Sequence, residues 1–106
     1  MERVVQLPAV KLPVDWNRVA DLCRRYHILK LWFFGSVLRD DFRPDSDVDI
    51  LVQFEEGKTP GFEFVTLIEE LERIVGRPVD LMTEPSLRNP YLKREILRTR
   101  QLAYAA

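Results

Sequence analysis

Residues 28–54 read ILKLWFFGSVLRDDFRPDSDVDILVQF, and this stretch predicts two strands joined by a polar connection. The first apolar run, residues 28–34, is short, rich in aromatic side chains and stops at Gly35, which favours a buried strand. The second run, residues 47–54, is rich in β-branched side chains and predicts another strand. Residues 35–46 between them are expected to form a short helical turn followed by a loop.

Helical spacing of apolar residues flanks this stretch on both sides. With their caps, the predicted helices span residues 15–27, 59–76 and 89–103. The expected cap signals are Asp15, Thr59-Pro60, Gly76 and Asn89-Pro90. Residues 78–82 predict a third, short strand, and residues 1–13, which include two prolines, predict an extended lead-in. The alternating order of helices and strands predicts an α/β (α+β) fold, with helices flanking a small mixed sheet.

The length and composition of the chain limit the class of protein to which it can belong. The chain has 106 residues, and we expect one domain over residues 1–106. Hydrophobic residues make up 46% and charged residues 31%, which excludes a disordered or fibrous chain. The net charge of -1 suggests neither nucleic acid nor membrane as a direct partner. The single cysteine, Cys23, excludes an internal disulfide, and no apolar stretch resembles a signal peptide or membrane span. We therefore expect a cytoplasmic protein.

Three acidic residues in or beside predicted strands are the candidate metal ligands. Asp47 and Asp49 alternate along one strand and should share a face, where their carboxylates repel each other. A divalent cation would remove that repulsion, and ligands that are all oxygen favour a hard ion such as Mg²⁺. Asp80 lies in the strand at residues 78–82, and it can join the cluster if that strand pairs with the one carrying Asp47 and Asp49. Three carboxylates could then hold two Mg²⁺ ions, and Asp80 could also accept a proton from a hydroxyl.

The end of the first strand supplies a complementary anion site. Gly35 allows a phosphate to approach the backbone closely, and the following turn can offer backbone N–H groups. The Ser36 hydroxyl can donate a further hydrogen bond, and Arg39 can reach a phosphate oxygen. Each feature is unspecific when taken by itself, because Arg39 could equally pair with a nearby aspartate. Their combination with the acidic strand predicts a site for a metal-bound phosphate.

A calcium loop is the competing interpretation of the acidic residues. Asp45, Asp47, Asp49 and Glu56 occupy positions 1, 3, 5 and 12 of an EF-hand loop. Position 6, which needs glycine for a sharp turn, is Ile50, and the segment has the pattern of a strand. We therefore disfavour an EF-hand.

The spacing of these residues resembles a known signature. Gly35-Ser36, ten residues and then Asp47-Val48-Asp49 match the G-S-x10-D-x-D pattern of nucleotidyltransferases of the DNA polymerase β-like superfamily. The wider match over residues 33–52 resembles the minimal nucleotidyltransferase (MNT) domains, which are commonly the antitoxins of HEPN/MNT toxin–antitoxin pairs. The resemblance implies the nucleotidyltransferase fold, ATP as substrate and Mg²⁺ as cofactor. It also implies transfer of AMP to a tyrosine hydroxyl of a partner HEPN toxin.

The resemblance also assigns roles to particular residues. Gly35 and Ser36 would hold the triphosphate, with Arg39 as a further nucleotide-binding residue. Asp47 and Asp49 would bind the metal ions, and Asp80 fits the third acidic position. Two alternatives remain open: an antitoxin that masks its toxin without catalysis, and nucleotidyl transfer to a small molecule or RNA. A homo-oligomer or hetero-oligomer is compatible with either.

Overall fold

The computed structural model describes residues 3–4, 12–39, 43 and 45–106. The helices are α1 (Trp16–Arg25), α2 (Glu63–Val75) and α3 (Pro90–Thr99), with short 3-10 turns η1 (Gly35–Leu38) and η2 (Glu84–Ser86). The strands are β1 (Arg3–Val4), β2 (Ile28–Phe34), β3 (Val48–Phe54), β4 (Val79–Thr83) and β5 (Gln101–Ala105). Among the described residues, no helix is long and apolar enough to span a bilayer.

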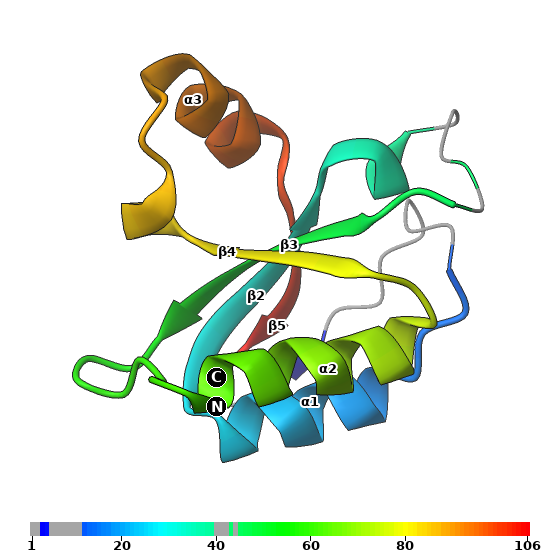
Figure 1. Ribbon diagram of the computed structural model, residues 1–106, viewed down its shortest axis with the longest axis vertical. Coiled ribbons are helices and arrows are strands. Elements are labelled where there is room, and N and C mark those ends of the chain that lie inside the picture. The colour runs from blue at the N-terminus through cyan, green and yellow to red at the C-terminus, as the bar shows by residue number, and fades with distance from the viewer. Residues whose placement is uncertain (1–2, 5–11, 40–42, 44) are drawn as a thin grey trace.

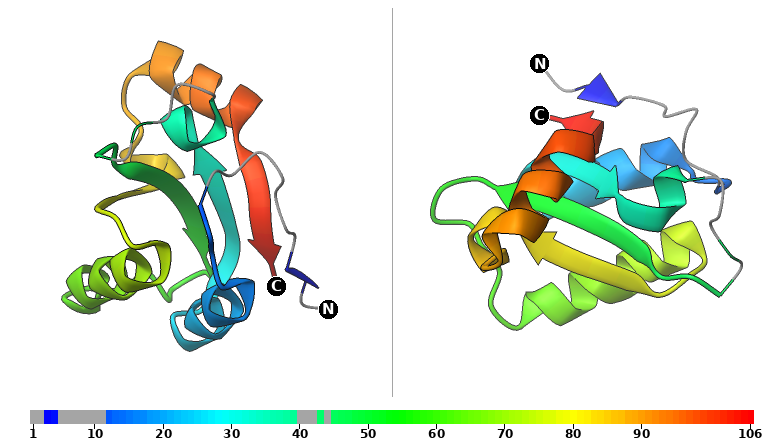
Figure 2. Two further views of the ribbon diagram at one scale, coloured as in Figure 1. Left: turned by 90° about the vertical axis from the view of Figure 1, so that its right-hand side faces the viewer. Right: turned by 90° about the horizontal axis from the view of Figure 1, so that it is seen from above.

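The strands form one mixed sheet in the order β1-β5-β2-β3-β4. β3 and β4 are parallel, and the other pairs are antiparallel. The helices α1 and α2 lie side by side on one face, whereas η1 and α3 lie on the opposite side (Figures 1 and 2). The expected α+β fold with a small mixed sheet is therefore confirmed.

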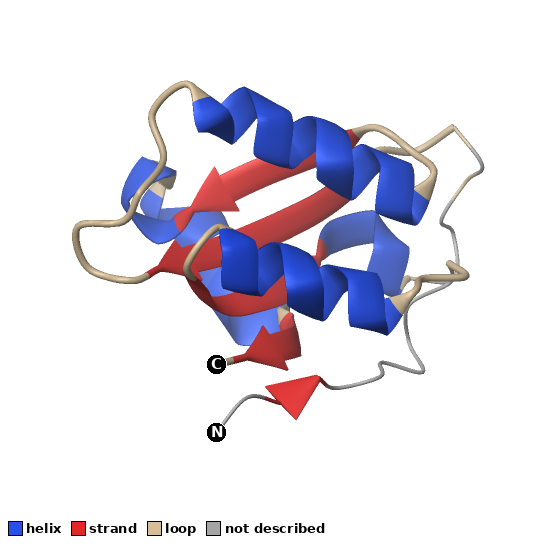
Figure 3. Ribbon diagram, turned by 90° about the horizontal axis from the view of Figure 1, so that it is seen from below, coloured by secondary structure: helices blue, strands red, loops and turns tan. Residues whose placement is uncertain are grey.

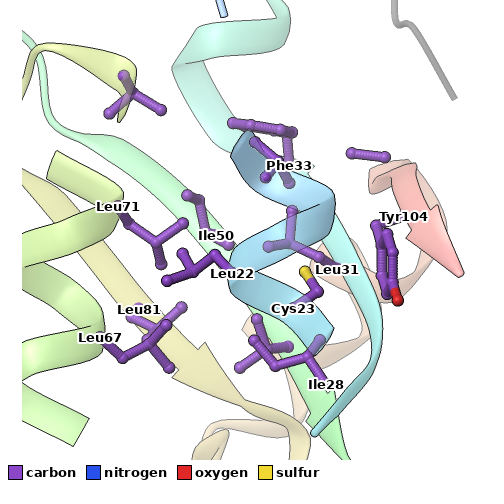
Figure 4. Close-up of a cluster of buried hydrophobic side chains, with 14 of the residues drawn as sticks. Leu22, Cys23, Ile28, Leu31, Phe33, Ile50, Leu67, Leu71, Leu81 and Tyr104 are labelled. Atoms are coloured by element: carbon purple, nitrogen blue, oxygen red, sulfur yellow. The ribbon is translucent and has the colours of Figure 1, made fainter. Parts of the chain in front are cut away.

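The main core lies between the sheet and the pair α1 and α2, which cover this face in the view of Figure 3. Leu22 and Cys23 of α1 and Leu67 and Leu71 of α2 pack there against the strands (Figure 4). A second, smaller cluster on the other face contains the buried side chains of Phe34, Leu51 and Ile96. Alternation along β3 sends Val48, Ile50 and Val52 into the main core and leaves Asp49 for the α3 face.

Three predicted caps are confirmed. The Asp15 carboxylate accepts hydrogen bonds from the backbone N–H groups of Asn17 and Arg18 at the start of α1. Asn89 caps α3 in the same way, and Gly76 ends α2 with φ of +74°, in the left-handed region.

Two predicted boundaries are wrong. The helix expected from Thr59-Pro60 begins only at Glu63, after a turn in which the Phe64 N–H donates to the carbonyl of Gly61. Glycine at position 61 disfavours an earlier start, because it is costly inside a helix. The last helix ends at Thr99 rather than near Ala103, and residues 101–105 form β5.

β5 inserts between β1 and β2. Without it, the long strand β2 would leave one row of backbone hydrogen-bonding groups unpaired. Of the expected lead-in, Arg3–Val4 pairs with β5, and residues 5–11 lie outside the described part of the chain.

Candidate functional site

The end of β2 carries the glycine of the site. Gly35 has φ of +75°, a backbone conformation that side chains rarely adopt, and it opens the turn η1. A Cβ atom added at this position would collide with Oδ2 of Asp49. The backbone of the Gly35-Ser36 turn and the Asp49 carboxylate therefore lie in direct contact, although 13 positions separate Ser36 from Asp49.

The two strands that carry Asp49 and Asp80 lie next to each other, which is the condition under which Asp80 was expected to join the cluster. β3 and β4 pair in parallel, and their register sets Asp49 opposite Asp80. Since residues opposite each other in a sheet project to the same face, both carboxylates belong to the α3 side. Asp47 precedes β3 rather than belonging to it, and its side chain is exposed like that of Asp80.

The electrostatics of the site centre on Asp49. Burial, and to a smaller extent the charges of Asp80 and Asp47, together raise the pKa of the Asp49 carboxyl from 3.8 to about 6, while Arg39 opposes the shift. The shift shows that the three carboxylates interact. A cation placed among them would stabilise the charged form of Asp49.

A groove of about 570 Å³ adjoins these groups on the α3 face. One wall is η1 with the residue after it, the other wall is α3, and Asp49 and Phe34 lie between them. Its lining residues are Phe34, Gly35, Ser36, Leu38, Arg39, Asp49, Leu92, Glu95, Ile96, Thr99 and Gln101. Figure 2 shows α3 and η1 side by side above the sheet.

The predicted site residues divide into two groups. Gly35, Ser36, Arg39 and Asp49 line the groove together. Asp47 and Asp80 do not line the groove, but their negative charges raise the pKa of Asp49, which does line it. In the part of the chain that the structure describes, no three His, Cys, Asp or Glu side chains are grouped so as to hold a metal ion by themselves.

The donor chemistry nevertheless suits a hard cation. The carboxylate oxygens of Asp49, Asp80 and Asp47 are anionic donors with no nitrogen or sulfur ligand among them, and the charges of Asp80 and Asp47 act on Asp49. A cation that takes most of its ligands from phosphate and water needs only one or two protein carboxylates. The residues present therefore fit an ion that arrives with a phosphate substrate.

The wall formed by α3 was not predicted from the sequence. Leu92, Glu95, Thr99 and Gln101 line the groove although none belongs to the signature around Gly35 and Asp49. The apolar spacing of Leu92 and Ile96 indicated a packed helix face, but no local signal says which face of the sheet a helix covers.

Comparison with known proteins agrees with this arrangement. A nucleotidyltransferase domain family model matches residues 18–103. A Methanocaldococcus jannaschii relative, named as a candidate protein adenylyltransferase, is 44% identical over 73 residues, which are 68% of this chain and 73% of that protein. The protein adenylyltransferase MntA of Thermococcus cleftensis is 40% identical over 74 residues, which are 69% of this chain and 73% of that protein.

Solved structures share the fold. A candidate minimal nucleotidyltransferase is 37% identical, with a TM-score of 0.67, over 81% of this chain and 86% of the other. A toxin–antitoxin structure with AMP-PNP has a TM-score of 0.69 over 88% of this chain and 75% of the other, at 19% identity, and so shows likeness of fold only. From the family match over residues 18–103 and these close relatives, we conclude that this chain belongs to the nucleotidyltransferase domain family and is an enzyme of that class.

Proposed function

We propose that this chain transfers AMP from ATP to a hydroxyl group of a partner protein, in the presence of Mg²⁺. The observation that supports this most directly is the contact between the Gly35 turn and Asp49 at one end of the groove. That contact brings a phosphate-binding backbone and an anionic cation ligand together. A nucleoside triphosphate carrying its metal ion needs both at once.

The groove has room for the rest of a nucleotide. Its volume of about 570 Å³ falls within the usual range for small-molecule sites. Apolar side chains from both walls, Leu38 on one and Leu92 and Ile96 on the other, offer surfaces for an aromatic base. Polar groups at the Gly35-Ser36 end suit the phosphates.

In this proposal each residue of the chain has a defined task. Backbone N–H groups of the Gly35-Ser36 turn and the Ser36 hydroxyl donate to phosphate oxygens, and the Arg39 guanidinium stabilises their charge. Asp47 and Asp49 would hold Mg²⁺, and Asp80 would be the third ligand. When bound, Mg²⁺ neutralises charge on the triphosphate and lowers the pKa of the attacking hydroxyl.

Proton transfer and product release complete the reaction. The oxygen of the acceptor hydroxyl attacks the α-phosphorus of ATP and forms a new P–O bond. The bond between the α-phosphorus and the oxygen that bridges to the β-phosphorus breaks, and pyrophosphate leaves. Asp80, which is exposed at the edge of the sheet, can accept the proton of that hydroxyl. An exposed base is accessible to a hydroxyl on a second protein, which a deeply buried carboxylate would not be.

The relatives suggest the class of acceptor. Two are named as protein adenylyltransferases, and a structural neighbour is a toxin–antitoxin assembly with an ATP analogue. We therefore infer that the acceptor is a tyrosine of a HEPN-type toxin and that the present chain is its antitoxin.

Incubation with labelled ATP, Mg²⁺ and the toxin encoded beside this chain tests the proposal. We expect label on the toxin, and loss of at least about 100-fold in rate for Asp49→Asn, because the variant removes a cation ligand. Glu56→Gln, an exposed change outside the groove, is the matched control and should act like the wild type. Absence of both label and ATP binding in the wild-type protein would contradict the proposal.

A double variant distinguishes an antitoxin that masks its toxin from one that modifies it by catalysis. The double variant Asp47→Asn, Asp49→Asn should still bind the toxin, because the substitutions preserve side-chain shape. If catalysis neutralises the toxin, this variant should no longer protect cells. Full protection by a variant that transfers no label would instead support an antitoxin that acts by masking.

A further inference from the structure

Asp47 lies just before β3 and therefore outside the hydrogen-bonded sheet that holds Val48 and Asp49. β3 begins at Val48, so the strand pairing with β4 fixes Asp49 but does not extend to Asp47. The Asp47 side chain is exposed, and its charge and that of Asp49 repel each other. Some other contact has to hold this segment if Asp47 is to stay near Asp49.

The connection between α2 and β4 makes that contact. Nη1 of Arg77 donates a hydrogen bond of 2.7 Å to the backbone carbonyl of Arg43. The next residue, Pro78, accepts a hydrogen bond of 2.9 Å from the Val48 N–H. Two consecutive residues of the connection thus bind the segment on both sides of Asp47, four positions before it and one position after it.

The segment on which Arg77 acts is itself a closed turn. The Ser46 N–H donates to the Arg43 carbonyl at 3.1 Å, and the Arg43 N–H donates to Oγ of Ser46 at 3.2 Å. The Arg43 carbonyl therefore accepts from two donors, one of them the charged guanidinium. Holding that carbonyl therefore also holds Ser46, the residue directly before Asp47.

The connection is anchored on its other side as well. Oε2 of Glu72, in the last turns of α2, accepts a hydrogen bond of 2.9 Å from the Val79 N–H at the start of β4. The helix α2 is packed through Leu67, Leu71 and Val75 into the main core. Arg77 therefore connects a well-supported part of the fold to the segment that carries Asp47.

We propose that Arg77 is a positioning residue, which holds Arg43 and, through it, Ser46, and thereby places Asp47 beside Asp49 for cation binding. This inference rests on the proposed function for the role of Asp47, but the tether itself is a property of the protein without ligands. A guanidinium suits the task because its several donors can hold a carbonyl in a fixed geometry.

Hydrogen exchange of the ligand-free protein tests the tether directly. We expect Arg77→Ala to raise the exchange of the backbone amides of residues 46–48 about tenfold, with little change in β2. Arg77→Lys retains a charged donor and should restore part of the protection. Arg73→Gln removes a positive charge from the exposed face of α2 away from the groove and is the matched control.

Nucleotide binding then tests the consequence for the site. The Mg²⁺ concentration needed for half-maximal binding of a non-hydrolysable ATP analogue should rise about tenfold in Arg77→Ala, as for loss of other supporting contacts to metal ligands. Binding of the analogue in EDTA should not change. An equal loss in EDTA would mean that Arg77 contacts the nucleotide, and would overturn the positioning role.

A second variant tests the tether if Arg77→Ala does not fold. If Arg77→Ala does not fold, Ser46→Ala removes one bond of the same turn and should raise the same amide exchange by a smaller factor. Unchanged exchange at residues 46–48 in the variants that fold would refute the tether. If the wild-type protein binds no magnesium nucleotide, the proposed function fails, whereas the exchange result still decides whether Arg77 holds the turn.

Discussion

Gly35 and Gly57 have nearly the same backbone, with φ of +75° and +76°, but different surroundings. A Cβ at Gly35 would meet the Asp49 carboxylate, whereas a Cβ at Gly57 would meet nothing within 4 Å. Both substitutions to alanine carry the left-handed backbone cost, about 1–2 kcal/mol. Only Gly35→Ala adds a collision with a residue of the site.

We therefore expect the two alanine variants to differ in function more than in stability. Gly57→Ala should lower the free energy of unfolding by about 1 kcal/mol and leave nucleotide binding unchanged. Gly35→Ala should lower it further and abolish binding of the ATP analogue. Urea unfolding and fluorescence titration measure the two quantities, and equal binding by both variants would show that the Gly35 contact is dispensable.

Asp49 makes the stability of the metal-free protein depend on pH. Its pKa in the folded protein, about 6, exceeds its ordinary value of 3.8, so the folded state binds the proton more tightly than the unfolded state. The proton on Asp49 makes its full contribution to the free energy of unfolding below pH 3.8. That contribution is lost as the pH rises through about 6. Between these values the wild-type protein should lose stability relative to a variant without the charge.

Asp49→Asn should consequently be more stable than the wild type at pH 7.5 in EDTA. Allowing for the partial exposure of the side chain, we expect about 1–2 kcal/mol. The difference should shrink toward pH 4, as followed by urea unfolding, and Glu56→Gln should show no such trend. A stability difference that does not vary with pH would contradict the electrostatic explanation.

At the scale of elements, the last strand shows how strongly the sheet depends on its C-terminal residues. Tyr104 of β5 is 1% exposed and lies opposite Leu31 of β2 and Val4 of β1. Tyr91, on α3, is 79% exposed and provides a matched control. The same substitution can therefore be compared at a buried and an exposed position.

Tyr104→Ala should lower the free energy of unfolding by about 3–5 kcal/mol, because it removes a large buried side chain and leaves a cavity. Tyr91→Ala should change it by less than about 0.5 kcal/mol. Urea denaturation followed by circular dichroism measures both. A small effect at Tyr104 would mean that β5 contributes little to the sheet.

At the scale of the whole molecule, the two faces of the sheet are unequally supported. The face under α1 and α2 contains the larger core, whereas α3 packs through the small cluster of Phe34, Leu51 and Ile96. A helix with few buried contacts opens at lower free energy than the core. The wall that α3 contributes to the groove should therefore be the less stable one.

Native-state hydrogen exchange can measure this difference. Ile96→Ala should speed exchange in α3 well before it affects β2, because Ile96 is the buried contact of that helix. Leu71→Ala, in the main core, should destabilise the whole molecule by about 2–5 kcal/mol. If the amides of α3 exchange only when those of β2 and β3 also exchange, in both variants, then the molecule opens as a single cooperative unit instead.

The local pattern determined much of this protein. The alternation in residues 48–54 puts Asp49 on the opposite face from Val48, Ile50 and Val52, which enter the main core, because side chains of a strand alternate between its two faces. Asp15, Gly76 and Asn89 ended or began helices as expected, since capping needs only the atoms of a few neighbouring residues. The same holds for the glycine that ends β2.

Tertiary structure decided the remainder. Residues 101–105 contain good helix formers, yet they became β5 because the edge of β2 needed hydrogen-bonding partners. The position of α3 as a wall of the groove and the raised pKa of Asp49 also arise from residues far apart in the sequence. Such contacts depend on which segments meet in space, and that is a property of the whole packed chain rather than of any local stretch.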